Sequence, residues 1–337
     1  MKILYAVQKT GNGHVARAQE IIPILQKFGC VDILASGNQS QIELPFDVKY
    51  NLKGISLVYN EKGEVSYWKT FLNNNYWAFL KDIIQLKTKK YDLIINDFEP
   101  VSAWASLFKG GNIISLSHQA ALFFNEVPKP KKRALLAQFI LKYYAPCRRK
   151  YGFHFKNYHD KIFTPVIREK IRNLKSETIP GNYIVYLPSF SDAKLIKTLS
   201  KINGNWHIYS KYASSNYTIN NCSVYPINEE DFLFKLSHCE GVLCNAGFEL
   251  PAEALYLKKK LVVIPIKKQI EQEYNAIALK KLGVLTLKQL DQNLISIWSK
   301  SDSCLSMNFS KDIEAILKEI ISENVSITAE TTNYHFA

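Results

Sequence analysis

The chain has 337 residues, more than a single hydrophobic core usually organises, so we expect two domains. Hydrophobic residues make up 47% and charged residues 22%, which excludes a largely disordered chain. Lysine and arginine outnumber aspartate and glutamate by 43 to 30, a net charge of +13. This excess favours polyanionic partners such as nucleic acid, anionic lipid or a phosphate-bearing small molecule.

No stretch of the sequence is long enough to span a bilayer. The most apolar run, 134–141, ends at Lys142 and falls well short of the ~20 residues required. The N-terminus lacks the apolar core of a signal peptide, so we expect a cytoplasmic protein. The six cysteines contain no C-x-x-C pair, which indicates reduced thiols and no zinc site.

A strand-then-helix rhythm runs through the first half of the chain. Between short apolar strands at 2–7 and 31–36, residues 15–28 form a helix whose apolar face comprises Ala18, Ile21, Ile22, Leu25 and Phe28. Continuous apolar runs indicate buried parallel strands at 92–97 and 112–117, with helices at 79–87 and 102–108. This alternation predicts a doubly wound parallel sheet.

The segment 154–182 interrupts the rhythm, which then restarts. Five strand-like runs follow, mostly separated by helical stretches, at 183–188, 206–210, 222–225, 241–245 and 261–266. A last amphipathic stretch, 311–322, is suited to pack back onto the first half. We therefore predict an α/β chain with domains at 1–165 and 166–305, a returning helix at 306–322 and a flexible tail at 323–337.

Ligands of open parallel sheets bind beyond the carboxyl ends of the strands, so residues that follow the strands are the candidate site. After the first strand, residues 11–16 read GNGHVA and formally satisfy G-x-G-x-x-G/A. A dinucleotide fingerprint also needs an acidic residue at the end of the second strand, but that strand ends in Ala35-Ser36-Gly37, which argues against a dehydrogenase. Gly11 and Gly13 still allow a ligand to approach the backbone closely.

His14 falls at the strand-to-helix turn, off the apolar face of the helix. It titrates near neutral pH and suits a general base, the alternative being a structural turn histidine. Asp97 or Glu99, after the strand at 92–97, could accept a hydrogen bond from the imidazole and fix its tautomer, or Asp97 could cap the next helix. His118 follows the strand at 112–117, either as a catalytic group or as a hydrogen-bonded histidine lining the cleft.

In the second half, the strand at 241–245 is followed by Ala246, Gly247, Phe248 and Glu249. Gly247 is placed at a helix start, where free amides and the helix dipole attract anions. Glu253 lies on the first turns of that helix and can accept two hydrogen bonds from a ribose diol. Glu249, nearer the helix start, is suited to stabilise the dipole.

The segment at 245–276, NAGFELPAEALYLKKKLVVIPIKKQIEQEYNA, resembles the donor-binding region of GT-B glycosyltransferases. Similar members are the lipid-intermediate N-acetylglucosaminyltransferase of peptidoglycan synthesis, the UDP-glucuronosyltransferases and their uncharacterised prokaryotic relatives. GNGH is similar to the glycine-rich turn with histidine in these enzymes, and NDFEP and SLSHQ are similar to segments of the uncharacterised relatives. The resemblance spans both halves and implies two Rossmann-like domains facing each other across a cleft.

The resemblance also implies an activity: transfer of a sugar from a nucleotide-sugar, with UDP as the favoured nucleotide, to a hydroxyl of an unidentified glycan, lipid or small molecule. His14 would be the base or an acceptor-site residue. The amides of Gly247 and Phe248 would bind the donor diphosphate, and Glu253 the ribose. The sugar hydroxyls would face Gln269, Glu271 and Gln272, and the donor site would also include Gly13, Ser189, Asn228, Ala246 and Glu249. Relatives have a glycine-rich phosphate loop where this chain has Ser189 and Ser191, so the role of these serines stays open.

The chain has no Asp-x-Asp pair, so we expect neither a metal nor a cofactor. Helix amides and basic side chains would neutralise the diphosphate, and the family implies inversion at the anomeric carbon. Two alternatives remain: a nucleotide-sugar epimerase of the same fold, and a nucleotide-binding regulator without catalysis.

Two segments could explain the excess of basic over acidic residues. Residues 128–150 carry cations at both ends of an apolar centre, and 66–79 are rich in aromatic residues. Together they suit a patch that touches anionic lipid, and the alternative is an ordinary core-facing helix with solvated ends. A nucleic-acid partner is disfavoured because these residues form no known nucleic-acid recognition motif.

Overall fold

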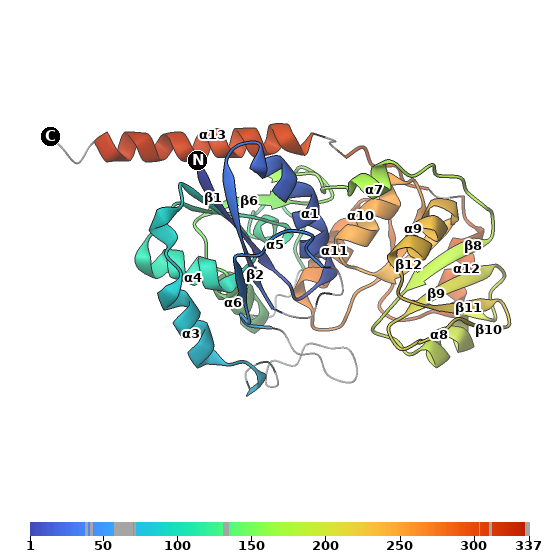
Figure 1. Cartoon of the computed structure of the whole chain (residues 1–337). Helices are drawn as coiled ribbons and strands as arrows, with labels where there is room; N and C mark the ends of the chain where they lie inside the picture. The colour runs from blue at the N-terminus through green and yellow to red at the C-terminus, as the bar shows by residue number, and fades with distance from the viewer. Residues whose placement is uncertain are drawn as a thin grey trace.

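A seven-stranded parallel sheet organises the N-terminal half in the computed structural model (Figure 1). In spatial order its strands are β3 (Tyr50–Leu52), β2 (Cys30–Ser36), β1 (Lys2–Gln8), β4 (Leu93–Asp97), β5 (Ile113–Ser117), β6 (Arg149–Phe153) and β7 (Ile162–Phe163). The helical segments of this half include α1 (Asn12–Gln26), α3 (Tyr76–Gln85), η1 (Thr88–Lys90), α4 (Pro100–Lys109), α5 (His118–Ala121) and α6 (Leu135–Tyr144). The structure describes all residues except 38–39, 41–42, 57–69, 71, 131–134, 303, 310–311 and 334–337.

The strands are continuous apolar runs because both faces of the sheet are covered. Along β1, Ile3, Tyr5 and Val7 belong to a core that includes the apolar face of α1. The alternate residues Leu4 and Ala6 belong to a second core on the other face, which includes residues of α3 and α4. All five side chains are fully buried, as the two-residue period of a covered central strand requires.

The C-terminal half repeats this plan with a second seven-stranded sheet, in which only the edge strand β10 is antiparallel to its neighbour. In spatial order its strands are β10 (Tyr217–Ile219), β11 (Cys222–Pro226), β9 (Asn205–Ser210), β8 (Asn182–Tyr186), β12 (Gly241–Asn245), β13 (Lys260–Ile264) and β14 (Leu285–Thr286). Its helices are α8 (Asp192–Leu199), α9 (Glu229–His238), α10 (Glu249–Tyr256), α11 (Ile270–Lys281) and α12 (Gln292–Lys300). The predicted architecture of two α/β halves is confirmed.

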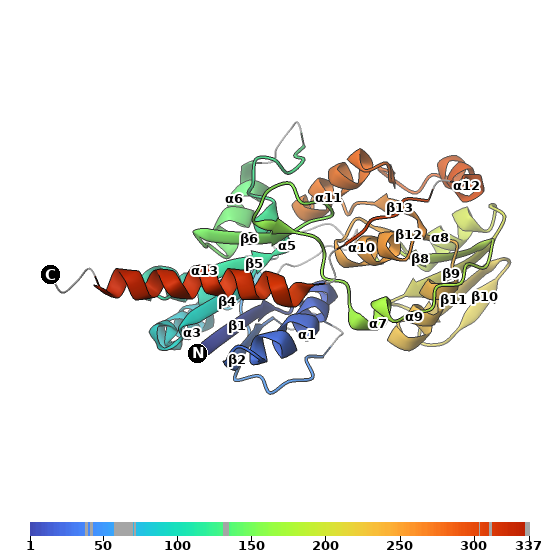
Figure 2. The same ribbon diagram turned by 90° about the horizontal axis from the view of Figure 1, so that it is seen from above.

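Two segments cross between the halves. The chain passes from β7 through the short helix α7 (Glu169–Arg172) into β8. After α12 it returns, and the long helix α13 (Ile313–Asn333) lies along the N-terminal half (Figure 2), with Leu317 and Ile320 fully buried. The helix continues to Asn333, so it occupies most of the segment that we expected to be a flexible tail.

The segment at 128–150 is not one amphipathic helix. Its described part contains α6, which ends at Tyr144, and then β6, which begins at Arg149 inside the N-terminal sheet. Part of this prediction, at 131–134, lies outside the described residues, as do 66–69 and 71 of the aromatic segment. Within the part of the chain that the structure describes, no helix has the length and apolarity needed to cross a membrane.

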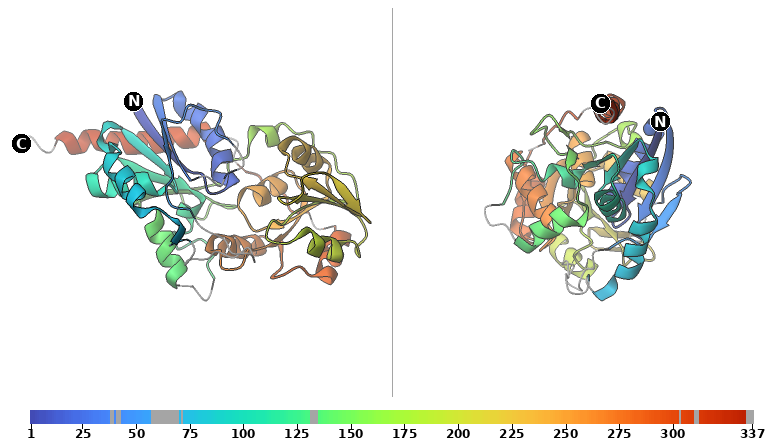
Figure 3. Two further views of the ribbon diagram at one scale, coloured as in Figure 1. Left: turned by 60° about the horizontal axis from the view of Figure 1, so that its bottom comes forward. Right: turned by 90° about the vertical axis from the view of Figure 1, so that its left-hand side faces the viewer.

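Each sheet has a switch point where the strand order reverses. In the N-terminal sheet it lies between β1 and β4, and Val7 is paired with Asp97 at their carboxyl ends. In the C-terminal sheet it lies between β8 and β12, where Tyr186 is paired with Cys244. The halves lie side by side (Figures 1 and 3), and ligands of such sheets bind at these points.

Candidate active site

Two adjoining cavities lie between the switch points. One, of about 340 Å³, is lined by His14, Arg17 and residues of both halves, and we call it the His14 cavity. The other, of about 410 Å³, contains Glu253, and we call it the Glu253 cavity. Both cavities are lined by Asn12, Gly13, Tyr186, Glu249 and Leu250, so they are two parts of one cleft.

His14 stands on the first turn of α1, directly beyond β1, and faces Asp97 at the end of β4. Its Nδ1 lies 2.8 Å from Asp97 Oδ1. A carboxylate only accepts hydrogen bonds, so Nδ1 carries the proton and donates, which leaves Nε2 as the basic nitrogen of the neutral ring. Of the two predicted orienting carboxylates, Asp97 therefore occupies this position.

Arg17, three residues after His14 on α1, donates hydrogen bonds to the same carboxylate from two nitrogens of its guanidinium group. Its Nε donates to Asp97 Oδ2 at 3.0 Å and its Nη2 to Oδ1 at 2.8 Å. Arg17 Nη2 also lies 3.1 Å from His14 Nδ1. Both nitrogens carry protons that point to the carboxylate, so this third contact is a close approach without a hydrogen bond.

The charges in this cluster shift the pKa values of its members in opposite directions. Burial alone would raise the pKa of Asp97, but the positive charge of Arg17 and the hydrogen bonds from Arg17 and His14 lower it below its usual value. Burial lowers the pKa of His14, but Asp97 and Glu249 outweigh burial and Arg17 and raise it above 6.5. These shifts favour the charged form of Asp97 and make His14 a stronger base than a free imidazole.

Glu249 brings the C-terminal half into the same cluster. Its Oε1 accepts a hydrogen bond of 2.7 Å from Arg17 Nη1. The carboxylate also lies against Gly13, where an added Cβ would come within 2.2 Å of Glu249 Oε2. A side chain at position 13 would therefore displace the Glu249 carboxylate, so Glu249 lies in close contact with α1 and does more than stabilise a helix dipole.

Gln119, on α5, bridges the base and the C-terminal half. Its amide nitrogen donates to Glu271 Oε2 at 2.9 Å and lies 3.3 Å from His14 Nε2. The amide oxygen is buried without a hydrogen-bond partner in the protein, and so is Oε1 of Gln269. Both glutamines line the His14 cavity, which therefore offers two unused acceptors to a ligand.

His118 lines the His14 cavity, but both of its ring nitrogens are engaged. Nδ1 lies 2.9 Å from the Phe153 carbonyl oxygen, and Nε2 lies 2.7 Å from Asn275 Oδ1. The ring stacks on Phe248 with centroids 3.9 Å apart. Burial lowers the pKa of His118. This environment suits a histidine that joins the two halves better than one that exchanges protons with a substrate.

Four other predicted site residues make structural contacts, and three of them, Glu99, Ser189 and Ala246, lie outside the linings of the two cavities. Glu99 caps α4 by accepting from the amides of Val101 and Ser102 at 2.7 and 2.6 Å. Ser189 pairs with Asn245, and the Ala246 carbonyl accepts from Asn275. Gln272 lines the His14 cavity, but its Oε1 accepts from the Ile266 amide.

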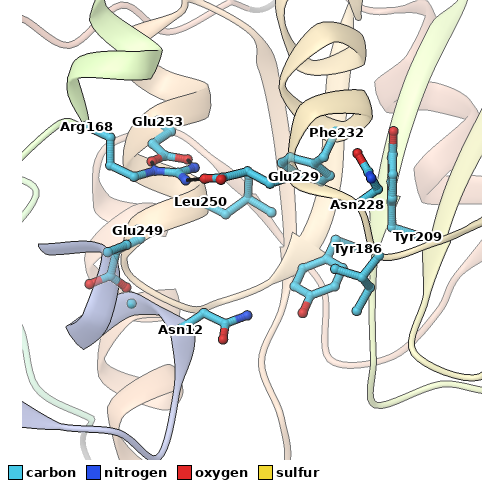
Figure 4. A pocket seen from close by; sticks show the side chains of 13 residues that line it. Asn12, Arg168, Tyr186, Tyr209, Asn228, Glu229, Phe232, Glu249, Leu250 and Glu253 are labelled. Atoms are coloured by element: carbon cyan, nitrogen blue, oxygen red, sulfur yellow. Dashed lines mark hydrogen bonds and ion pairs between the residues drawn. The ribbon is translucent and has the colours of Figure 1, made fainter. Parts of the chain in front are cut away.

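The Glu253 cavity is lined by charged side chains and by aromatic side chains (Figure 4). Arg168 Nε and Nη2 donate to the two oxygens of Glu253 at 2.6 and 3.0 Å, and Nη1 donates to Glu229 at 2.7 Å. Burial raises the pKa of Glu253, although Arg168 opposes that shift. Asn228 caps α9 with its side chain, which accepts from the Asp231 amide, and it borders this cavity near Tyr186, Tyr209 and Phe232.

The remaining predicted donor residues line the His14 cavity: Gly247, Phe248, Gln269 and Glu271. Among the described residues, no group of histidine, cysteine, aspartate or glutamate side chains is arranged to hold a metal ion. Two arginines in the site escaped the sequence analysis. A signal for Arg17 existed, because a cation one turn before Ile21 interrupts the apolar face of α1, but Arg168 lies in an irregular linker without a pattern.

Sequence and structure comparisons assign the family. The chain matches the model of glycosyl transferase family 1 over residues 1–299. The glycotransferase of kitacinnamycin superposes with a TM-score of 0.60 at 11% identity, covering 99% of this chain and 98% of its own. MurG of Acinetobacter baumannii superposes with a TM-score of 0.55 at 13% identity, covering 94% and 99%.

A third solved structure carries a nucleotide: the Streptomyces sp. SF2575 glycosyltransferase SsfS6, complexed with thymidine diphosphate, superposes with a TM-score of 0.51 at 11% identity, covering 95% of this chain and 99% of its own. At such identities the likeness shows a shared fold. No curated protein matches the chain in sequence. The family match over most of the chain, the two facing sheets and these neighbours agree: the chain belongs to glycosyl transferase family 1 and is a glycosyltransferase of the GT-B fold.

Proposed function

We propose that this glycosyltransferase moves a sugar from a nucleotide-sugar, with UDP as the favoured nucleotide, to a hydroxyl group of its acceptor, with inversion and without a metal ion. One observation carries the proposal. The Nδ1 proton of His14 is held by Asp97, and Nε2 is left as a base in a cavity lined by both halves of the molecule.

The proposed step is a single displacement. The acceptor hydroxyl gives its proton to His14 Nε2 while its oxygen forms a bond to the anomeric carbon of the sugar. The bond from that carbon to the diphosphate breaks, and its electron pair leaves with the phosphate oxygen. Gly247 and Phe248 lie at the start of α10, where amides and the helix dipole favour the developing negative charge.

The Glu253 cavity is the proposed place of the nucleoside. Arg168 keeps the Glu253 carboxylate in a defined orientation, in which its remaining lone pairs can accept from a ribose diol. Tyr186, Tyr209 and Phe232 offer apolar walls to a planar base. Toward the His14 cavity, the unpartnered oxygen of Gln269 supports its predicted contact with a sugar hydroxyl.

A screen of nucleotide-sugars by thermal unfolding tests donor binding, because a ligand that binds only the native state raises the melting temperature. Product analysis of each stabilising donor, with and without a pool of hydroxyl acceptors, then separates the alternatives. A transferase yields a new glycoside and free nucleoside diphosphate only with an acceptor. Conversion of the donor without acceptor would identify an epimerase, and binding without any turnover would identify a regulator.

We also propose a cytoplasmic enzyme that meets the anionic face of a membrane through an apolar surface on α3, α4 and α6. Trp77 and Ile84 of α3 are 84% and 74% exposed, Phe108 of α4 is 65% exposed and Phe139 of α6 is 59% exposed. The helices are neighbours, since α3 packs on α4 and the indole of Trp104 in α4 donates to the Tyr143 carbonyl of α6. These helices and the segment after α3 also carry exposed lysines, among them Lys81, Lys87, Lys89 and Lys142.

Vesicle sedimentation tests this contact. Apolar side chains and lysines acting together should give binding to anionic vesicles at low salt that weakens as salt screens the charges. Trp77→Ser should reduce binding, while Trp104, which is partly buried, is left in place to maintain the helix packing. Equal binding to neutral and anionic vesicles, or binding to neither, would remove the membrane from the proposal.

A further inference from the structure

Arg17 is a buried cation whose side chain reaches both halves of the molecule. It is 3% exposed and stands on α1, where Nε and Nη2 grip Asp97 of β4. Its remaining nitrogen, Nη1, donates a hydrogen bond to Glu249 on α10 of the C-terminal half. A single guanidinium therefore connects the carboxylate that orients the base with a carboxylate of the opposite half.

The charged groups around His14 come from four elements of the fold. Asp97 of β4 and Glu249 of α10 favour the protonated imidazole, and Arg17 of α1 opposes it. Glu271 of α11 is separated from the ring by an intervening glutamine amide. Asp97 compensates Arg17 within the N-terminal half, and Glu249 adds a second compensating charge where the C-terminal half is seated against Gly13.

We propose that Arg17 is a positioning residue that, together with Glu249, ties the orientation and charge state of His14 to the seating of the C-terminal half. This inference rests on the proposed function in so far as His14 is the base. With Glu249 in contact, Arg17 holds Asp97 while part of its charge is compensated, and the imidazole is at its most basic. When Glu249 is withdrawn, the guanidinium keeps Asp97 as its charged partner, and its less compensated positive charge weakens the base.

The arrangement has a chemical use. A strong base beside an open cleft would activate water as readily as an acceptor, and the donor sugar would be hydrolysed. Here full basicity requires a contact made by α10, the same helix whose N-terminus is proposed to receive the diphosphate. The base is therefore strongest in the arrangement in which both halves of the site are assembled.

Titration of the histidine rings by ¹⁵N nuclear magnetic resonance tests the inference without any substrate. The chain has seven histidines, and the His14 signals are assigned by their loss in His14→Gln. In Arg17→Gln, the His14–Asp97 pair should take up its proton at a pH about one unit or more higher, because an opposing charge within hydrogen-bonding distance is gone. In Glu249→Gln, the pair should take it up at a lower pH, by roughly half a unit, since a favourable charge one guanidinium away is gone.

Two variants are matched controls. Arg172 and Glu20 form another ion pair between the linker and α1, and they lie outside both cavity linings. Arg172→Gln and Glu20→Gln remove the same charges and should leave the His14 titration unchanged. If Arg17→Gln fails to fold, Arg17→Lys replaces it, because lysine keeps the positive charge but cannot donate the paired guanidinium hydrogen bonds to Asp97. This variant should titrate near the pH of the native protein but populate both tautomers of the His14 ring.

The outcomes separate this inference from the proposed function. Shifts in Arg17→Gln and Glu249→Gln no larger than those of the two controls would overturn the coupling. So would a native ring whose neutral form carries its proton on Nε2. A coupled His14 in a protein whose His14→Ala variant keeps normal turnover would instead overturn the role of His14 as base and leave the coupling standing.

Discussion

The two cavities of the cleft contain the same ion-pair arrangement with different consequences. In each, an arginine donates from Nε and Nη2 to one carboxylate and from Nη1 to a second one: Arg17 to Asp97 and Glu249, and Arg168 to Glu253 and Glu229. Only the first carboxylate also receives a hydrogen bond from a histidine. The histidine is therefore the partner that separates proposed catalysis from proposed binding.

The pKa values of the two carboxylates, Asp97 and Glu253, are shifted in opposite directions. Burial raises the pKa of both, but at Asp97 the combined charges and hydrogen bonds of Arg17 and His14 win, and the net shift is downward. At Glu253 burial wins over Arg168, with Glu249 and Glu229 adding like charge, and the net shift is upward. One cation beside a buried carboxylate is therefore not sufficient to keep its pKa low, whereas an arginine and a histidine together are.

The largest effect is expected from removing the base. His14→Ala should lower turnover by about 100- to 10,000-fold, the usual contribution of general-base catalysis. Donor affinity should stay nearly intact, because the proposed nucleoside contacts lie in the other cavity. Steady-state kinetics and calorimetric titration of the donor measure the two quantities, and near-normal turnover would exclude His14 as the base and leave His118 as the next candidate.

A smaller loss is expected from Asp97→Asn, roughly ten- to a thousandfold, because the imidazole stays in place without an anion to hold its tautomer. The neutral side chain also leaves Arg17 with one fewer charged partner, so the thermal unfolding temperature should fall. The losses in His14→Ala and Asp97→Asn should combine to less than their sum, since the two residues act as one unit. Fully additive losses would show that Asp97 acts elsewhere.

In the other cavity, Glu253→Gln should weaken donor binding by about 1.5–3 kcal/mol, or roughly ten- to a hundredfold, the range for hydrogen bonds to a charged group. Turnover at saturating donor should change much less than in His14→Ala. Glu230→Gln, which removes the same charge from an exposed position on α9, is the matched control. A donor dissociation constant no different from that of the control would take Glu253 out of the donor site.

The smallest effect is expected from chelation: activity should persist in excess EDTA. Helix amides at α10 are the proposed partners of the diphosphate, and they need no ion. Loss of activity with EDTA that magnesium or manganese specifically restores would contradict the metal-independent mechanism and reopen the roles of the carboxylates in both cavities.

Much of the fold followed from local patterns. Continuous apolar runs placed the central strands of both sheets, and the restart of the rhythm after the linker predicted two halves. His14 was placed at the turn after the first strand, where the structure has it. Less regular parts did not follow: α13 extends past 322 to Asn333, and the segment at 128–150 divides into a helix and a strand.

The choice between Asp97 and Glu99 shows where sequence reasoning reached its limit. The two residues are adjacent to the end of the same strand, and both are acids that suit a cap or an orienting role. In the structure, β4 ends at Asp97, and Phe98 takes a positive φ of 55°, which turns the chain so that Glu99 becomes the cap of α4. The turn at this one residue thus leaves Asp97 facing His14 and makes Glu99 the cap of the next helix.

The sequence by itself determined the alternation of strands and helices, the two halves and the polar groups at the strand ends, because each of these depends on residues close together in the chain. Only the tertiary structure decided which of those groups meet. Arg17 and Glu249 are 232 positions apart, and Arg168 and Glu253 are 85 apart. Contacts between residues so far apart in the chain leave no periodicity to detect, since they arise only when the two halves and the linker between them pack together.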